Sequence, residues 1–104
     1  MKLYTNSEQT AKLIELGFDK PKTLIDKYYD FDAEAYVEVK AYSIGELLSF
    51  LPLAIQWTPR IISGNVIEYS FVIEGSELYY CNAHNELIDN LFDMCVKLKE
   101  ARVI

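Results

Sequence analysis

Cysteine and histidine are scarce in this chain of 104 residues, which holds two cysteines and one histidine. A structural zinc site takes four thiolate or imidazole ligands. Cys81, His84 and Cys95 supply only three, so we expect no metal and no cofactor. The two cysteines lie far apart, in segments with the patterns of ordered structure. We therefore expect reduced thiols, as in cytoplasmic proteins.

Proline and glycine are also few, at three and four residues, and leave little room for linkers. The length fits a single domain over residues 1–104. The first eight residues lack the apolar stretch of a signal peptide. The longest apolar run, near Leu47–Ile55, is too short to span a bilayer. We expect a soluble, cytoplasmic protein with no membrane partner.

Clusters of basic residues are missing as well. Ten bases are dispersed among sixteen acids, and the net charge is −6. An acidic protein is repelled by nucleic-acid phosphates unless its bases are concentrated in one place. We therefore expect no direct nucleic-acid binding. The chain also lacks a phosphate-binding glycine loop, a serine-nucleophile motif, HExxH and a Rossmann fingerprint.

The clearest pattern that is present runs from Asn82 to Ala101. One helical face carries His84, Leu87, Ile88, Leu91, Cys95 and Leu98. The opposite face carries Asn85, Glu86, Asp89, Asn90, Asp93, Lys97 and Glu100. Asn82 is a candidate N-cap. The spacing predicts an amphipathic helix, which needs an apolar surface to pack on.

Alternating apolar and polar residues predict a sheet as that surface. Residues 33–42 read as a half-buried strand with Ala35, Val37, Val39 and Ala41 on one side. Residues 66–74 read as a second strand, which follows a two-residue turn at Gly64-Asn65. A further turn at Gly75-Ser76 predicts a hairpin that pairs Phe71 with Tyr80 and Ile73 with Leu78.

Capping signals define the other elements. Thr5 and Glu8 have capping-box spacing, with Asn6 and Ser7 as alternative caps, and Gly17 ends this first helix. A capping box at Ser43–Glu46 begins a second helix, which Pro52 ends. Residues 18–32 fit either a helical turn or the start of a strand. Pro59 limits 53–63 to an edge strand, or to a loop with a short strand at Arg60–Ser63.

Together these elements predict an α+β fold. We expect a small antiparallel sheet of three to four strands, with helices packed on one face, in the order α-β-α-β-β-β-α.

Acidic and aromatic residues alternate before and within the first predicted strand. A candidate partner-binding surface consists of Tyr28, Tyr29, Asp30, Asp32, Glu34 and Tyr36. The alternative is a solvated loop with a few aromatics folded inward. An EF-hand is excluded, because its central glycine and terminal glutamate are not in register. Trp57 is either an exposed anchor or a core residue, and we expect the core.

Cys81 and His84 are three residues apart, which is a spacing open to a thiol nucleophile and its base. The alternative is that Cys81 is a strand residue and His84 lies in the first turn of the last helix. An oriented base and an oxyanion site are also required. We therefore expect no catalytic residues. Cys95 lies on the apolar stripe and fits a small buried hydrophobe.

The segment Ala41–Pro52 resembles a recurrent segment of small acidic proteins encoded on prophages and conjugative elements of gut anaerobic bacteria. Residues 11–19 are similar to the first helix of those proteins, and residues 91–98 resemble their last helix. The shared residues are caps, apolar stripes and a helix stop. This chain departs from the pattern at its end, where Ala101-Arg102-Val103-Ile104 replaces a Gly-aromatic pair. The resemblance implies an accessory gene of a mobile element and assigns no activity.

The residues favour a non-catalytic protein that acts by protein–protein interaction. An alternative is an acidic mimic that inhibits a host nucleic-acid-binding defence protein. An enzyme that uses Cys81 and His84 is the third reading. Self-association is a further expectation, since a strand left open beside Pro59 can pair across a two-fold axis.

Overall fold

A computed structural model describes residues 1–72, 76–81 and 84–104; within 71–81 it describes the backbone only. The fold is α+β, as predicted. The described elements are α1 (Ser7–Glu15), β1 (Thr23–Asp30), β2 (Ala35–Ala41), α2 (Ile44–Phe50), β3 (Ala54–Ile55), β4 (Thr58–Pro59), β5 (Ile61–Ser63), β6 (Val66–Val72), β7 (Ser76–Cys81) and α3 (Leu87–Glu100).

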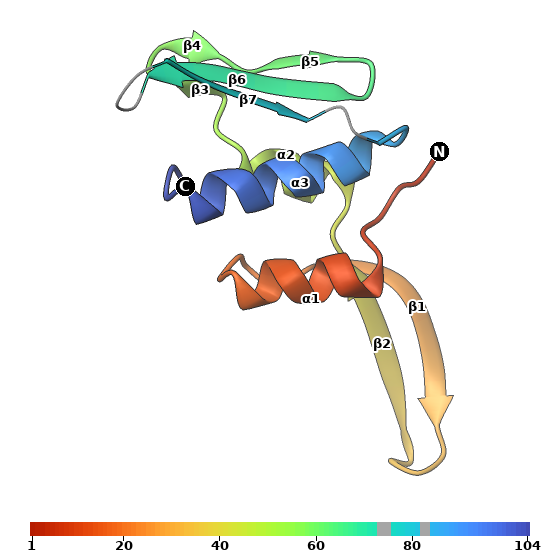
Figure 1. The fold of residues 1–104 in the computed structure, drawn as a ribbon. Coiled ribbons are helices and arrows are strands. Elements are labelled where there is room, and N and C mark those ends of the chain that lie inside the picture. Colours follow the sequence, from red (N-terminus) through yellow and green to blue (C-terminus); the bar gives the residue numbers. More distant parts are fainter. Residues whose placement is uncertain (73–75, 82–83) are drawn as a thin grey trace.

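The elements form layers around α3. The antiparallel sheet β5-β6-β7 lies on one side of α3, and α1 lies on the other (Figure 1). Helix α2 packs beside α3. The core is made by residues from all of these layers: Leu13, Tyr42, Leu47, Leu51, Ile67, Tyr69, Ile88, Leu91, Met94, Cys95 and Leu98. The prediction that the sheet supplies an apolar surface for the last helix is confirmed at Ile67 and Tyr69.

Local capping fixes the first two helices. Ser43 and Glu46 form the predicted capping box at the start of α2. At α1 the cap is Asn6, which makes a box with Gln9 rather than the Thr5–Glu8 pair. Gly17 has φ +95°, and the next residue, Phe18, donates its N–H to Leu13 O. This geometry is a Schellman motif, in which glycine tolerates the left-handed conformation.

The last helix begins later than predicted. Its first residue is Leu87 and its N-cap is Glu86, while Asn82 lies outside the described residues. His84 precedes the helix and is exposed, so it does not belong to the apolar stripe. Asn90, predicted on the polar face, is fully buried. Its side chain holds the segment before the helix, as described below.

The sheet differs from the prediction in register. The two-residue turn at Gly64-Asn65 is confirmed, because Ser63 pairs with Val66. In the next hairpin Val72 pairs with Ser76, and Phe71 pairs with Glu77 rather than Tyr80. The predicted pairing through Gly75-Ser76 is therefore wrong, because three residues rather than two separate the strands. Ile73 and Gly75 lie outside the described residues.

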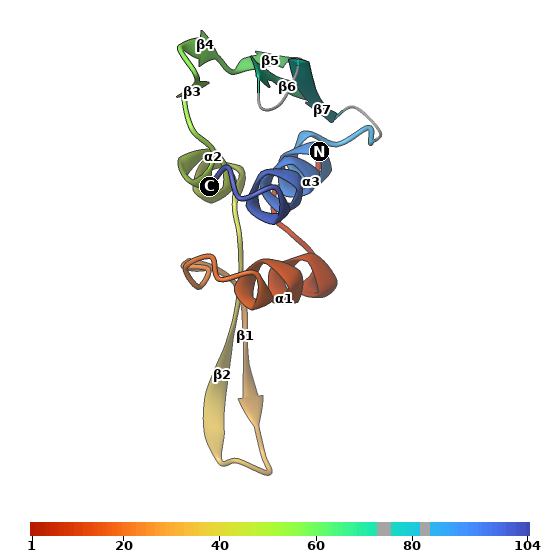
Figure 2. The same ribbon diagram turned by 60° about the vertical axis from the view of Figure 1, so that its left-hand side comes forward.

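The order of elements also differs, because residues 23–30 form a strand. β1 pairs antiparallel with β2, so the first helix is followed by a two-stranded hairpin. The hairpin projects from the body, away from the sheet β5-β6-β7 (Figures 1 and 2). The predicted strand at 33–42 is found as β2, and its burial alternates as predicted from Val37 to Ala41. Ala35 is exposed, however, and Tyr42, predicted on the polar side, is fully buried.

Residues 53–63 form more strand than predicted. β3 and β4 make a small ribbon in which Pro59 pairs with Ala54, and β5 joins the main sheet. The Arg60 guanidinium donates to the carbonyls of Leu48 and Leu51 at the end of α2, at 3.1 and 3.2 Å. Trp57, expected in the core, is 99% exposed. Among the described residues, no helix has the length and apolar character needed to cross a bilayer.

Candidate binding surface

The β1–β2 hairpin carries all six residues of the predicted partner-binding surface. Asp30 pairs with Ala35 at the end of the ladder, and residues 31–34 form the connecting loop. The Asp30 carboxylate accepts the backbone N–H groups of Asp32 and Ala33, at 2.9 and 3.2 Å. Such an Asx turn shapes the loop from within the chain. Glu34 closes the turn with φ 52°.

One face of the hairpin is aromatic. Tyr29 lies opposite Tyr36 in the ladder, and their rings meet edge to face with centroids 5.2 Å apart. Phe31 packs against Tyr29 in the same way, at 4.9 Å. The ammonium of Lys27 lies 5.0 Å from the centroid of the Tyr36 ring. We call Tyr29, Phe31 and Tyr36 the aromatic face.

These rings contact one another and not the core. Phe31 is 83% exposed and Tyr36 is 68% exposed. The alternative reading, in which aromatics fold inward from a solvated loop, is therefore not what the structure shows. Large exposed apolar groups that lie side by side mark interaction sites more often than scattered ones do.

The other face of the hairpin is mixed, with valines on β2 and Tyr28 among acids on β1. Tyr28 lies opposite Val37, and Asp26 lies opposite Val39. Val37 and Val39 are half-buried, while Tyr28 is 50% exposed. Neither face is covered by another element of the described chain.

The base of the hairpin is clamped to the body. The Tyr42 N–H donates to Thr5 Oγ1, and the Thr5 N–H donates to the Tyr42 carbonyl, both at 3.0 Å. The Tyr42 hydroxyl donates to Asp19 O at 2.6 Å. Burial, and then the charge of Glu46, raise the pKa of the Tyr42 phenol. This phenol is therefore a neutral hydrogen-bond donor that fixes where the hairpin leaves the body.

Glu46 joins α2 to the start of β1. Its carboxylate accepts the backbone N–H of Lys22 at 3.0 Å and the hydroxyl of Thr23. It also accepts the Ser43 N–H at 3.2 Å, which completes the capping box. Burial favours the neutral acid, but these hydrogen bonds prevail and hold the pKa of Glu46 below its usual value.

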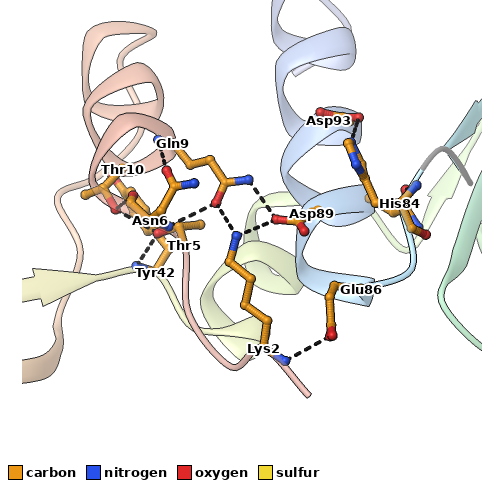
Figure 3. Close-up of polar contacts among 11 residues, drawn as sticks. Lys2, Thr5, Asn6, Gln9, Thr10, Tyr42, His84, Glu86, Asp89 and Asp93 are labelled. Carbon is orange, nitrogen blue, oxygen red and sulfur yellow. Dashed lines mark hydrogen bonds and ion pairs between the residues drawn. The ribbon is translucent and has the colours of Figure 1, made fainter.

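A polar junction ties α1 to α3 (Figure 3). The Lys2 ammonium donates to Asp89 Oδ1 at 2.7 Å and to Gln9 Oε1 at 3.2 Å. The Gln9 amide donates to the same Asp89 oxygen at 2.8 Å. Burial opposes the charge of Asp89, yet the hydrogen bonds from Lys2 and Gln9 hold its pKa below the usual value. These groups satisfy one another, so the junction holds the fold together.

Asn90 plays the same role beside the sheet. Its amide nitrogen donates to Asn65 O at 2.6 Å and to His84 O at 3.1 Å, and its oxygen accepts the His84 N–H at 3.2 Å. Sequence patterning missed this residue, because a buried asparagine and an exposed one look alike in a helical repeat. The one signal for its burial in the sequence was its position between Ile88 and Leu91 of the apolar stripe.

The structure gives no geometry for the proposed cysteine–histidine pair. The side chain of Cys81 lies outside the described residues. His84 Nε2 lies 2.8 Å from a carboxylate oxygen of Asp93. Cys95 is buried, as expected, with its sulfur 3.9 Å from Leu47 O. Among the residues that the structure describes, no three cysteine, histidine or acidic side chains gather as a metal site would require.

Trp57 is a second exposed aromatic, on the opposite side of the molecule from the hairpin loop. It lies in the two-residue turn between β3 and β4, and both turn residues, Gln56 and Trp57, have positive φ angles of 51° and 68°. Such turns favour asparagine and glycine.

Comparison with known proteins adds no relative to this picture. No family model, curated protein or solved structure matches the chain.

Proposed function

We propose that this protein is a non-catalytic interaction protein that binds another protein through the aromatic face of its β1–β2 hairpin. One observation carries the proposal: a projecting hairpin presents Tyr29, Phe31 and Tyr36 as one exposed cluster. Tyrosine and other aromatic side chains are enriched at the energetic centres of interfaces. Their apolar rings gain from leaving water, and the tyrosine hydroxyls can still be hydrogen-bonded.

The charge of the hairpin indicates the chemistry of the partner. Residues 23–41 contain five acids (Asp26, Asp30, Asp32, Glu34 and Glu38) and two bases (Lys27 and Lys40). The net charge of this segment is therefore −3, half of the −6 of the whole chain. A partner with a basic surface around an apolar pocket is complementary to this arrangement. Charge of this kind speeds association and makes it salt-dependent.

The resemblance of residues 41–52 to segments of proteins carried by mobile elements supports a setting in a prophage or conjugative element. In this proposal the protein acts on the cell that carries the element. The partner in this proposal is accordingly a host protein of a gut bacterium, and the hairpin is the part that contacts it.

Affinity capture from a gut-bacterial lysate tests the proposal when it is done with matched variants. The double variant Phe31→Ser/Tyr36→Thr removes two of the three rings of the aromatic face and keeps the ladder backbone. We expect the affinity of this variant for the captured protein to be about 30-fold lower than that of the natural chain, as for hot-spot truncations. Raising the salt concentration should weaken the same complex.

Trp57→Ser is the matched control, because it removes another highly exposed aromatic on the other side of the molecule. We expect this variant to capture the partner as the natural chain does. Recovery of no stoichiometric partner, or a partner retained by the hairpin variant and lost by the Trp57 variant, would contradict the proposal.

A further inference from the structure

A surface cavity of about 360 Å³ lies between α1 and α3. One residue of α1 and four residues of α3 line it: Lys12, Phe92, Asp93, Val96 and Lys97. This volume is at the lower end of the range for small-molecule sites in proteins. The polar junction of Lys2, Gln9 and Asp89 lies one helical turn away, since Asp89 precedes Asp93 by four residues (Figure 3). The cavity therefore lies between two helices that are already tied together.

The apolar part of the lining is held in place by the core. Phe92 and Val96 are half-buried and pack against the core residues, and each leaves part of its side chain open to the cavity. They are four residues apart on α3, so they lie on the same side of the helix. One aromatic ring and one branched aliphatic group thus offer a small, fixed surface for the apolar part of a ligand.

The polar part of the lining is mainly cationic. Two bases, Lys12 and Lys97, and one acid, Asp93, give the lining a charge of +1, whereas the whole chain carries −6. The one acid already has a partner, because a carboxylate oxygen of Asp93 lies 2.8 Å from His84 Nε2. Charge complementarity therefore favours an anion in this cavity over a cation.

Lys12 provides the most specific indication of an anion. It is half-buried, and its ammonium makes no ion pair or hydrogen bond with any residue that the structure describes. A charge that is partly removed from water is unfavourable unless it is paired. A lysine stem can lie along apolar surface while its ammonium stays at the rim. An anion at this rim supplies the missing counter-charge.

We propose that this cavity binds a small amphipathic carboxylate. Its apolar body lies on Phe92 and Val96, and its carboxylate pairs with the ammonium groups of Lys12 and Lys97. An aliphatic chain and a phenyl ring both satisfy this chemistry, so an aliphatic and an aromatic monocarboxylate are two sources of the same ligand. The site goes beyond the proposed contact with a protein partner, because none of its residues belongs to the β1–β2 hairpin.

NMR titration of the full chain with octanoate and with 3-phenylpropanoate tests the proposal. We expect at least one of the two to bind with a dissociation constant of about 1 mM or lower, as ligands of this size can. The amide shifts should concentrate in residues 9–16 and 89–97. Octan-1-ol and octylamine, which are uncharged and positively charged, should bind at least five-fold more weakly than octanoate. The tighter of the two carboxylates identifies the apolar body as a chain or a ring.

Charge variants test the role of the two lysines. Lys12→Gln and Lys97→Gln should each weaken carboxylate binding by about three-fold, and the double variant by about ten-fold, with octan-1-ol unaffected. Lys20→Gln removes an exposed lysine outside the cavity and is the matched control. Asp93→Asn removes the opposing charge, so it should tighten carboxylate binding by about three-fold. The amide spectrum of each variant verifies its fold.

The proposal is wrong if neither carboxylate gives saturable shifts. Equal binding of octanoate and octan-1-ol, or shifts centred on the hairpin or the sheet β5-β6-β7, would also overturn it. Carboxylate binding that Lys12→Gln and Lys20→Gln alter equally would exclude the assigned pairing. The capture experiment with the hairpin variants is separate, so either proposal can fail while the other stands.

Discussion

At the scale of single residues, Asp89 and Lys2 show how distant parts of the chain are joined. Lys2 precedes the first helix and Asp89 lies in the first turn of α3, and their charged groups meet at 2.7 Å. Gln9 contributes a second hydrogen bond to the same carboxylate oxygen. Because Asp89 also lies near the positive end of the α3 dipole, its charged form is favoured in the fold.

Replacement of Asp89 by Asn should therefore destabilise the protein in a pH-dependent way. The pKa of Asp89 is lower in the folded chain than in the unfolded one. The stabilisation is thus present above the unfolded pKa, near 4, and is lost as the pH falls through the folded pKa. We expect Asp89→Asn to cost about 1–2 kcal/mol of unfolding free energy at pH 7.

Urea unfolding at pH 7 and at pH 3 measures this effect. The gap between the natural chain and the variant should shrink at the lower pH. Glu100→Gln, an exposed acid at the other end of the same helix, is the control. A gap that is the same at both values would show that the charge of Asp89 does not contribute.

At the scale of elements, the β3–β4 ribbon has a turn whose residues are unfavourable for its backbone conformation. Its turn places Gln56 and Trp57 in the left-handed region, which costs side chains other than glycine and asparagine about 1 kcal/mol or more each. The indole is 99% exposed and gains no burial in return. The ribbon is nevertheless held against β6 and by Arg60, whose N–H donates to Leu53 O.

The double substitution Gln56→Asn/Trp57→Gly should stabilise the chain by about 1–2 kcal/mol, because Asn-Gly is the preferred sequence for such a turn. Thermal unfolding of the natural and substituted chains measures the difference. Asn65→Gly, in the turn between β5 and β6, is not a suitable control, because it would also remove the hydrogen bond from the Asn65 amide to His84 O. A better control is Ala33→Gly in the hairpin loop, where we expect no gain. A destabilised turn variant would show that Trp57 packs more than its exposure indicates.

At the scale of the whole molecule, the chain is elongated. Its extents are 56 × 27 × 19 Å and its radius of gyration is 15.8 Å, whereas a compact domain of this length has about 13 Å. The hairpin accounts for the elongation, since the core residues all lie in the layers around α3 (Figure 2). Stability is therefore concentrated in the layers, and the hairpin is held at its base.

Amide hydrogen exchange should reveal this division. In dilute solution we expect the amides of residues 26–29 and 36–39 to exchange at least 100-fold faster than those of residues 91–98, because exposed ladders open locally. Equal protection of hairpin and α3 in a dilute monomer would contradict the division.

The sequence by itself determined the features of the fold that depend only on neighbouring residues. The Ser43–Glu46 box, the Gly17 stop, the Gly64-Asn65 turn and the stripe from Ile88 to Leu98 all follow from local geometry, and each was predictable. The six residues of the candidate surface were also identified from composition alone. Their role in binding stays a prediction.

Only the tertiary structure decided which patterned segments are covered. The alternation at 35–41 is the same whether a strand lies on a core or projects into water, so it did not reveal that the hairpin projects and that Ala35 is exposed. The hairpin register at Val72–Ser76, the buried Asn90 and the exposed Trp57 depend on contacts between distant segments. Neighbouring residues do not reveal those contacts, because the burial of a residue depends on which distant segments pack against it.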